Sequence, residues 1–136
     1  MEFNITRGLV RYQKRFFLLK RATDPLPENI GKWECPGGTL KGEESPTENV
    51  LRECQLELGV SCRVVKELSF FDYHTDTVKS RCHVFLLEAE NTAVELTEEH
   101  SEWMLVDPQE VQDFDLVLFA SLLLEYFRNP EFYGLV

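Results

Sequence analysis

Two glutamates one helical turn apart, Glu53 and Glu57, are the residues of this sequence whose spacing most clearly suggests chemistry. Residues four apart in a helix share a face, so these carboxylates repel each other. A hard divalent cation removes that repulsion and uses oxygen ligands of this kind. Such a cation neutralises phosphate charge and activates water, and the preceding Gly37 and Gly38 let backbone groups approach a ligand closely. The combination is typical of phosphoanhydride hydrolysis; the alternative is an exposed helix with ordinary surface acids.

A well-marked helix positions both acids. Ser45 is placed to cap its N-terminus, Pro46 suits the first helical position, and Glu48 completes a capping box. Gly59 is placed to end the helix. Apolar residues recur between these ends at the spacing of one helical face. They are Val50, Leu51, Cys54 and Leu58.

The rest of the chain alternates strand-like and turn-like segments. Strands are predicted at residues 5–12, 15–21, 64–73, 81–88 and 102–106, with a short extended piece at 33–36. A loop is predicted at 23–32, a short helical turn at 108–112, and a packed terminal helix at 116–127, which is mostly apolar. Strands interrupted by one central and one terminal helix indicate an α/β or α+β fold, in which helices flank a mixed sheet.

The stretch from Gly38 to Val60 reads GTLKGEESPTENVLRECQLELGV. It resembles the Nudix box, the signature G-x5-E-x7-R-E-U-x-E-E-x-G-U of the Nudix hydrolases, in which U is apolar. Cys54 and Val60 fill the apolar places, and Leu56 stands where the family has a further acid. Six of the seven charged or glycine anchors are present, namely Gly38, Glu44, Arg52, Glu53, Glu57 and Gly59.

The resemblance implies a metal site built on this box. Glu53 and Glu57 are expected to hold Mg²⁺, with Mn²⁺ as an alternative, and the carbonyl of Gly38 is expected to contribute. The segment that begins Glu99-His100-Ser101 resembles the part of the family in which a glutamate adds a ligand or a base. Glu99 aligns best by its distance to the following strand, and Glu98 is the alternative.

The resemblance also implies the catalytic set Glu53, Glu57, Arg52 and Glu44. Arg52 is expected to orient the acids through an ion pair with Glu44. Glu53 is an alternative base for the attacking water. Leu56 leaves the number of bound metals open, and it leaves open a weakened or inactive enzyme.

Substrate contacts are expected from Arg21, Lys32, Gly37 and Gly38. Lys20 is a further candidate, because the first part of the chain holds nearly all the cations. The alternative for these cations is plain solubility. Several aromatic residues are candidates for stacking on a base or for the core: Trp33, Phe70, Phe71, Tyr73 and Trp103. The three histidines are candidates for a direct role or for packing: His74, His83 and His100.

Composition sets further limits. The chain has 136 residues and a formal net charge of −10, which suits one domain over residues 1–136 and argues against binding a nucleic acid polymer through its phosphates. Residues 82–136 hold one basic and 12 acidic side chains. These acids are either a solvated face or, in part, metal ligands.

The cysteines and the apolar segments favour a cytoplasmic location without membrane partners. Cys35, Cys54, Cys62 and Cys82 lack the spacing of a zinc site, so we expect them to be reduced and mostly buried. The sequence shows neither a signal peptide nor an apolar run long enough to span a membrane.

Together these features predict a Mg²⁺-dependent pyrophosphohydrolase with the α/β/α sandwich of the Nudix family, a mixed β-sheet flanked by helices. The first expected substrate is a nucleoside triphosphate, cleaved to the monophosphate and pyrophosphate. ADP-ribose or a nucleotide sugar is one alternative. The other is a module of the same fold that binds a nucleotide or a protein without cleaving it. The expected assembly is a monomer or a homodimer.

Overall fold

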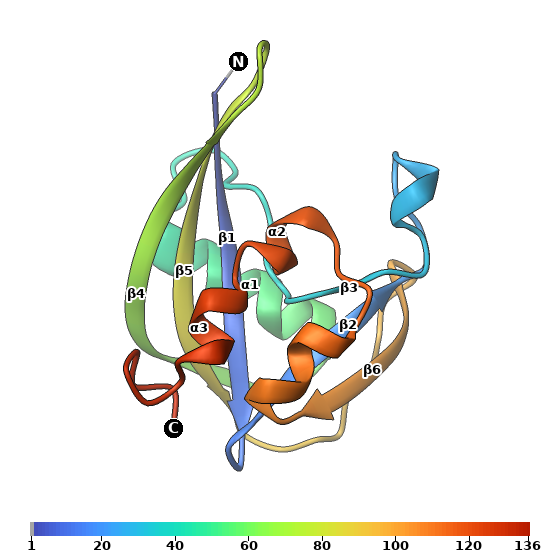
Figure 1. Ribbon diagram of the computed structural model, residues 1–136, viewed down its shortest axis with the longest axis vertical. Coiled ribbons are helices and arrows are strands. Elements are labelled where there is room, and N and C mark those ends of the chain that lie inside the picture. Colours follow the sequence, from blue (N-terminus) through green and yellow to red (C-terminus); the bar gives the residue numbers. More distant parts are fainter. Residues whose placement is uncertain (1) are drawn as a thin grey trace.

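The computed structural model describes residues 2–136 (Figure 1). Its strands are β1 (Glu2–Tyr12), β2 (Arg15–Arg21), β3 (Trp33–Glu34), β4 (Cys62–His74), β5 (Lys79–Ala89) and β6 (His100–Val106). Its helices are α1 (Pro46–Leu58), α2 (Leu118–Ser121) and α3 (Leu124–Arg128), and short 3-10 helices cover Pro27–Asn29 and Pro108–Asp113. None of the helices within residues 2–136 has the length and apolar character needed to cross a bilayer.

The six strands form one mixed sheet in the order β3-β2-β1-β5-β4, and β6 also pairs with β2. The pairing of β1 with β5 is parallel, from Glu2 opposite Lys79 to Arg11 opposite Glu88. The other pairings are antiparallel. The mixed sheet with flanking helices confirms the predicted α/β class.

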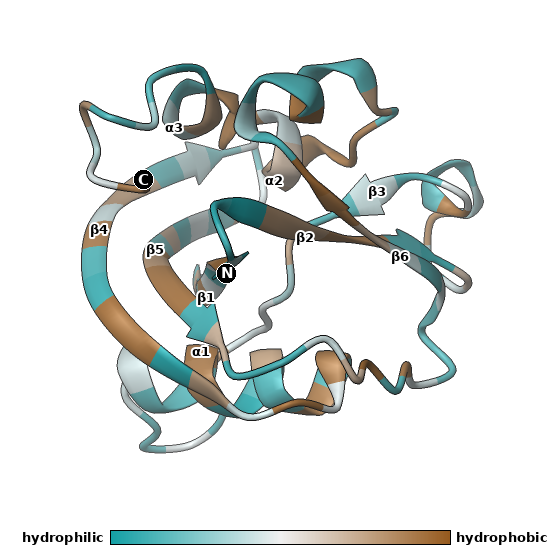
Figure 2. Cartoon of the chain, turned by 90° about the horizontal axis from the view of Figure 1, so that it is seen from below, coloured by the Kyte–Doolittle hydropathy of each residue, from teal (hydrophilic) through white to brown (hydrophobic). Residues whose placement is uncertain are grey.

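Helices cover the sheet on both faces, which explains why its central strands are buried on both sides. Figure 2 shows α1 on one face and α2 and α3 on the other. Leu9 and Val10 are adjacent in β1 and wholly buried, yet they belong to different apolar clusters. Val10 packs with the residues of α1, and Leu9 packs with those of the C-terminal helices.

Helix α1 begins and ends where the sequence predicts. The backbone N–H of Glu48 donates to Oγ of Ser45, and the Ser45 N–H donates to the Glu48 carboxylate. Gly59 takes the left-handed conformation with φ 69°, and its N–H donates to the carbonyl of Gln55. These caps fix the ends of the helix, and the buried stripe that includes Cys54 fixes its rotation against the sheet.

The single terminal helix predicted at residues 116–127 is wrong. The structure has two short helices there, α2 and α3, separated by a turn at residues 122–123. The N–H of Leu123 donates to the carbonyl of Ala120, and that of Tyr126 donates to Leu123, each three residues back instead of four. This tightening places Leu123 and Phe127 together in the core.

The other predicted elements are confirmed with small shifts of their ends. The loop at 23–32 contains the 3-10 helix Pro27–Asn29, the helical turn at 108–112 is also 3-10, and β1 begins at Glu2. The extended piece at 33–36 pairs as a strand only over Trp33–Glu34. All four cysteines are free as predicted, and three of them are buried.

Candidate active site

The box acids and both downstream glutamates line one pocket of about 330 Å³. Helix α1 provides Glu53 and Glu57 from adjacent turns. Glu98 and Glu99 come from the segment just before β6, more than forty residues away in the sequence. The full lining is Glu53, Leu56, Glu57, Thr97, Glu98 and Glu99. The fold therefore gathers four carboxylates around one cavity, with a leucine side chain among them.

Glu57 is the buried acid of this pocket, with 5% of its surface exposed. Its Oε2 accepts a hydrogen bond of 2.8 Å from the N–H of Gly37. Burial raises the pKa of Glu57 to about 8, although the Gly37 N–H and the charge of Arg7 act in the opposite direction. No cation of residues 2–136 lies within ion-pair distance of this carboxylate.

The turn that carries Gly37 and Gly38 is fixed to β1 by two backbone hydrogen bonds. The Thr6 N–H donates to the Gly38 carbonyl at 2.8 Å, and the Gly8 N–H donates to the Pro36 carbonyl at 2.7 Å. A Cβ on Gly38 would lie 2.6 Å from Cδ of Glu53, and one on Gly37 would overlap the Thr6 carbonyl. Both positions therefore need glycine for close approach, and the Gly38 carbonyl already accepts one hydrogen bond.

Arg52 links the box acids at the edge of the pocket. Its Nε and NH2 donate to the two oxygens of Glu44 at 2.7 and 3.1 Å, and its NH1 lies 3.0 Å from Oε1 of Glu53. The hydrogen bond from Arg52, followed by one from Asn49, lowers the pKa of Glu44 to about 2. A planar guanidinium held on two oxygens of one carboxylate has a fixed orientation, so Arg52 holds Glu53 in place.

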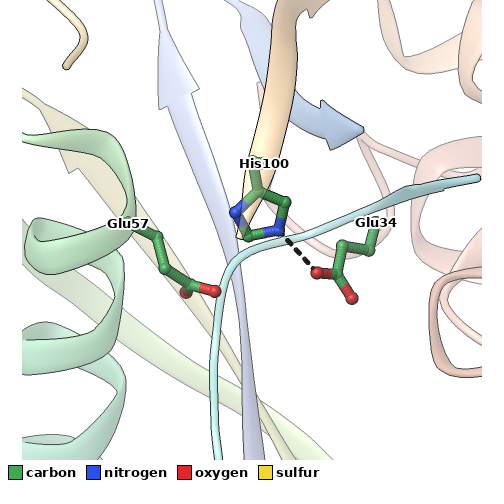
Figure 3. Close-up of side chains that lie close together, drawn as sticks. All are labelled: Glu34, Glu57 and His100. Atoms are coloured by element: carbon green, nitrogen blue, oxygen red, sulfur yellow. Dashed lines mark hydrogen bonds and ion pairs between the residues drawn. The ribbon is translucent and has the colours of Figure 1, made fainter. Parts of the chain in front are cut away.

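A second group of buried side chains lies beside Glu57, and the sequence did not reveal it. His100 lies between Glu34 and Glu57 (Figure 3). Its Nε2 is 2.7 Å from Oε2 of Glu34, and one ligand atom from each of the three residues lies within 4.8 Å of the others. Glu34 follows Trp33 in β3 and precedes the glycine turn. A charged residue inside a short, otherwise apolar segment is the signal that could have identified it.

Glu34 is ionised in spite of its burial. Burial by itself raises the pKa of Glu34, but the hydrogen bond from His100 and the charges of Arg7 and Arg21 outweigh it, so the pKa lies below its ordinary value. The carboxylate therefore accepts from the Nε2–H of His100. It also accepts from NH1 of Arg21 at 2.7 Å.

The cations expected to bind phosphate have other partners or lie apart from the pocket. The Arg21 side chain is 17% exposed and bridges Glu34 and Asp24. Lys20 pairs with Glu102 at 3.3 Å and lies over the ring of Trp33. Lys32 is half-buried and directly precedes β3. Arg21 thus stabilises Glu34 rather than presenting a free charge.

The aromatic candidates contact other side chains of the fold. Trp33 packs edge-on against Phe114, and Trp103 packs against Phe17. Phe71 and Tyr73 both contact Phe119, and Phe70 packs against His83 and Arg81. His83 also lies within 3.2 Å of Asn4. None of the five rings lines the acidic pocket, while Trp33 and Trp103 line a separate pocket with Ser101 and Met104.

The residues of the pocket offer the donor chemistry of a hard divalent cation, while the described side chains whose ligand atoms converge within 4.8 Å are Glu34, Glu57 and His100. The donors that Glu53, Glu57, Glu98 and Glu99 offer are all carboxylate oxygens, the ligands that Mg²⁺ prefers. The buried Glu57 carboxylate also lacks a cationic partner among the described residues. A bound dication would remove that electrostatic cost. Glu57 belongs both to this pocket and to the group with Glu34 and His100, so a cation held by either group would be bound by Glu57.

In the metal-free protein, the buried charge of Glu57 should lower the free energy of unfolding. Because the pKa of Glu57 rises from its ordinary 4.5 to about 8 on folding, its ionisation lowers the free energy of unfolding progressively as pH rises between those values. Glu57→Gln removes the charge and keeps the shape. With a chelator present, the variant should therefore become more stable than the wild type as pH rises from 5 to 8. Urea unfolding at several pH values measures this, and a difference independent of pH would contradict it.

The chain is similar to known proteins in sequence and in structure. The model of the NUDIX domain matches residues 3–127. A curated RNA pyrophosphohydrolase from Gluconacetobacter diazotrophicus is 34% identical over 65 residues. That match covers 46% of this chain and 39% of the relative, so it spans less than half the length of that protein.

Solved structures extend the similarity over nearly the whole chain. A MutT protein from Methanosarcina mazei is 25% identical, with a TM-score of 0.78, and the match covers 96% of this chain and 95% of the other. The ORF135 protein of E. coli is 20% identical with a TM-score of 0.79, over 93% and 89% of the two chains. An ADP-ribose pyrophosphatase from Streptococcus suis is 16% identical with a TM-score of 0.73, over 95% and 91%. The last two similarities show the shared fold.

Proposed function

The chain belongs to the Nudix hydrolase family, and from that premise we propose that it is a Mg²⁺-dependent pyrophosphohydrolase that cleaves a nucleoside triphosphate to the monophosphate and pyrophosphate. The observation that supports this most is the pocket in which α1 and the segment before β6 bring four carboxylates together. Hydrolysis of a phosphoanhydride needs such a place, because the charge of the phosphates must be neutralised while water attacks. We also propose that residues 1–136 form a single domain.

Each residue in and around the pocket has its own proposed role. Glu53 and Glu57, with Glu98 or Glu99, would hold the divalent metal that this family typically uses. When bound, the metal neutralises phosphate oxygens and lowers the pKa of a water molecule. The Gly37 N–H orients Glu57, and Arg52 orients Glu53 while its own position is fixed by Glu44. Gly37 and Gly38 pack closely on Thr6 and Glu53, which holds the turn against the strand and the acid that it serves.

The choice of a triphosphate rests on the compactness of the fold. Within residues 2–136, the structure shows a sheet, its helices and short connections, and no added segment that encloses a large second moiety. ADP-ribose and nucleotide sugars remain the alternatives to test, because the structural neighbours include an ADP-ribose pyrophosphatase and a UDP-X diphosphatase.

A specific observation favours a second candidate, a nucleotide-binding module without turnover. Leu56 is 58% exposed and lies in the pocket where the Nudix box has an acid. Its side chain offers no ligand atom, so this pocket holds one carboxylate fewer. A site that binds a nucleotide and a metal but cleaves slowly would have this composition.

A substrate panel should separate the two candidates. Wild-type protein with Mg²⁺ is incubated with the nucleoside triphosphates, ADP-ribose and a UDP-sugar, and phosphate release is followed after addition of pyrophosphatase or phosphatase. We expect the triphosphates to be cleaved fastest, with products identified by chromatography. Faster cleavage of ADP-ribose or of the UDP-sugar would replace the triphosphate assignment. Binding without turnover of any compound would favour the module.

A further inference from the structure

Arg7 lies within β1, directly beside the glycine turn of the candidate active site. It lies between Thr6 and Gly8, whose N–H groups hold the turn at Gly38 and Pro36. A Cβ on Gly37 would come within 2.9 Å of the Arg7 Cα. The backbone of Arg7 is therefore in contact with the residue that orients Glu57.

The Arg7 side chain points to the face of the sheet opposite α1. Successive side chains of a strand alternate between faces, and Thr6 faces α1, where its Oγ1 donates to Asn49. Arg7 accordingly shares its face with Ile5 and Leu9, which belong to the apolar cluster under the C-terminal helices. A guanidinium among apolar residues needs a specific partner to offset its desolvation.

The described part of the chain supplies Arg7 with little polar contact. Its NH1 donates to the carbonyl of the adjacent Thr6 at 3.1 Å. Its Nε is buried and has no hydrogen-bond partner. No carboxylate of residues 2–136 lies within ion-pair distance of it. A buried donor left unpaired is costly, so the unpartnered Nε of Arg7 points to a partner that arrives from outside.

The other arginines near the pocket are already paired. Arg21 is held by Glu34 and Asp24, and Arg52 is held by Glu44 and Glu53. Arg7 is the cation of this neighbourhood that has no ion pair within residues 2–136, and its charge still acts on both Glu34 and Glu57. It is therefore a positive charge near the acids that no carboxylate of the described chain neutralises.

We propose that Arg7 is a substrate-binding residue whose guanidinium donates hydrogen bonds to the phosphate chain of a nucleoside polyphosphate lying over Gly37 and Gly38. A planar guanidinium matches two oxygens of one phosphoryl group. Gly37 touches the backbone of Arg7 and donates its N–H to Glu57, so the turn lies between these two residues and a phosphate chain over it would approach both. The proposal rests on the proposed function for its ligand class.

Binding measurements on two substitutions test the role of Arg7. The probes are a nucleoside triphosphate with a methylene group between its α and β phosphorus atoms, inorganic tripolyphosphate, and the free nucleoside, each with Mg²⁺ in a calorimeter. Arg7→Gln should weaken binding of both phosphate probes about 10- to 100-fold, the usual effect of losing hydrogen bonds to a charged group. Arg7→Lys should recover only part of that loss. Nucleoside binding should stay unchanged.

Arg11→Gln is the matched control. Arg11 lies on the same strand and the same face as Arg7, but it is paired with Glu88 and the carbonyl of Leu135. The Arg11→Gln substitution should leave the affinity for both phosphate probes unchanged. If Arg7→Gln fails to fold, Arg7→Lys decides, because an ammonium keeps the charge but not the planar fork. Undiminished phosphate affinity in that variant would overturn the proposal.

The remaining outcomes separate this inference from the proposed function. A lower melting temperature of Arg7→Gln with unchanged affinity for both phosphate probes would show a purely structural role and reject the proposal. An equal loss of nucleoside binding would assign Arg7 to the base and also reject it. Phosphate binding that depends on Arg7 in a protein without turnover would reject the hydrolase and leave this inference standing.

Discussion

Glu57→Gln is expected to lower the rate of hydrolysis by at least about 10²- to 10³-fold, the scale on which loss of one charge-stabilising group acts in an active site. Glu57 is the buried carboxylate of the pocket and has no cationic partner in the described chain. Glutamine keeps the shape and can still accept from the Gly37 N–H, but it offers a neutral and weaker metal ligand. The rate is measured at saturating Mg²⁺ with the best substrate of the panel.

Glu43→Gln provides the control for this loss. The Glu43→Gln substitution removes the same charge within the box segment, but Glu43 is exposed and lies outside the pocket. We expect its rate to stay within a factor of two of the wild type, on the order expected for an exposed surface site. Calorimetric titration with Mg²⁺ should show weaker uptake for Glu57→Gln only. An unchanged rate in that variant would remove Glu57 from the metal assignment.

Glu34→Ala is expected to destabilise the fold by about 3–5 kcal/mol, the range for removing one partner of a buried ion pair. The Glu34 side chain is 5% exposed and accepts from both Arg21 and His100. Without it, a guanidinium with 17% exposure and an imidazole with none lose their shared acceptor. Urea or thermal unfolding measures the change.

The dependence on pH distinguishes this mechanism from a simple loss of packing. Because the folded-state pKa of Glu34 lies below its ordinary value, the ionised carboxylate stabilises the fold above that ordinary value, and the stabilisation is lost as pH falls through the folded-state pKa. The difference between wild type and Glu34→Ala should therefore shrink in acid. Glu102→Ala, which breaks the more exposed pair with Lys20, should cost less than about 1 kcal/mol. A loss for Glu34→Ala that is equally large in acid would contradict the assignment.

Local sequence signals were sufficient for helix α1 and for the strands. The capping residues around Ser45 and the glycine at position 59 act within one turn of chain, so their pattern is visible without the fold. The spacing of Glu53 and Glu57 likewise needed only helical geometry, and the structure places both in one pocket. The two downstream glutamates were located by a resemblance, and both line the same pocket.

The features that the sequence did not predict depend on contacts between distant segments. Glu34 and His100 come from β3 and β6, which both pair with β2, and no local pattern joins residues so far apart. Arg7 was not singled out, because an arginine in a strand reads as a surface charge until its neighbours are known. The break between α2 and α3 was missed because the run from 116 to 127 contains neither proline nor glycine.

The parallel pairing of β1 with β5 constrains the order in which the chain folds during translation. The first strand emerges early, but it contacts β2 at only two residue pairs, and its long edge pairs with residues 79–88. Until those residues leave the ribosome, the nascent chain exposes the unpaired edge of β1 beside the segment that becomes the acidic pocket. Residues 79–88 precede Glu98 and Glu99 in the chain, so the partner strand of β1 emerges before the last acids of the pocket do.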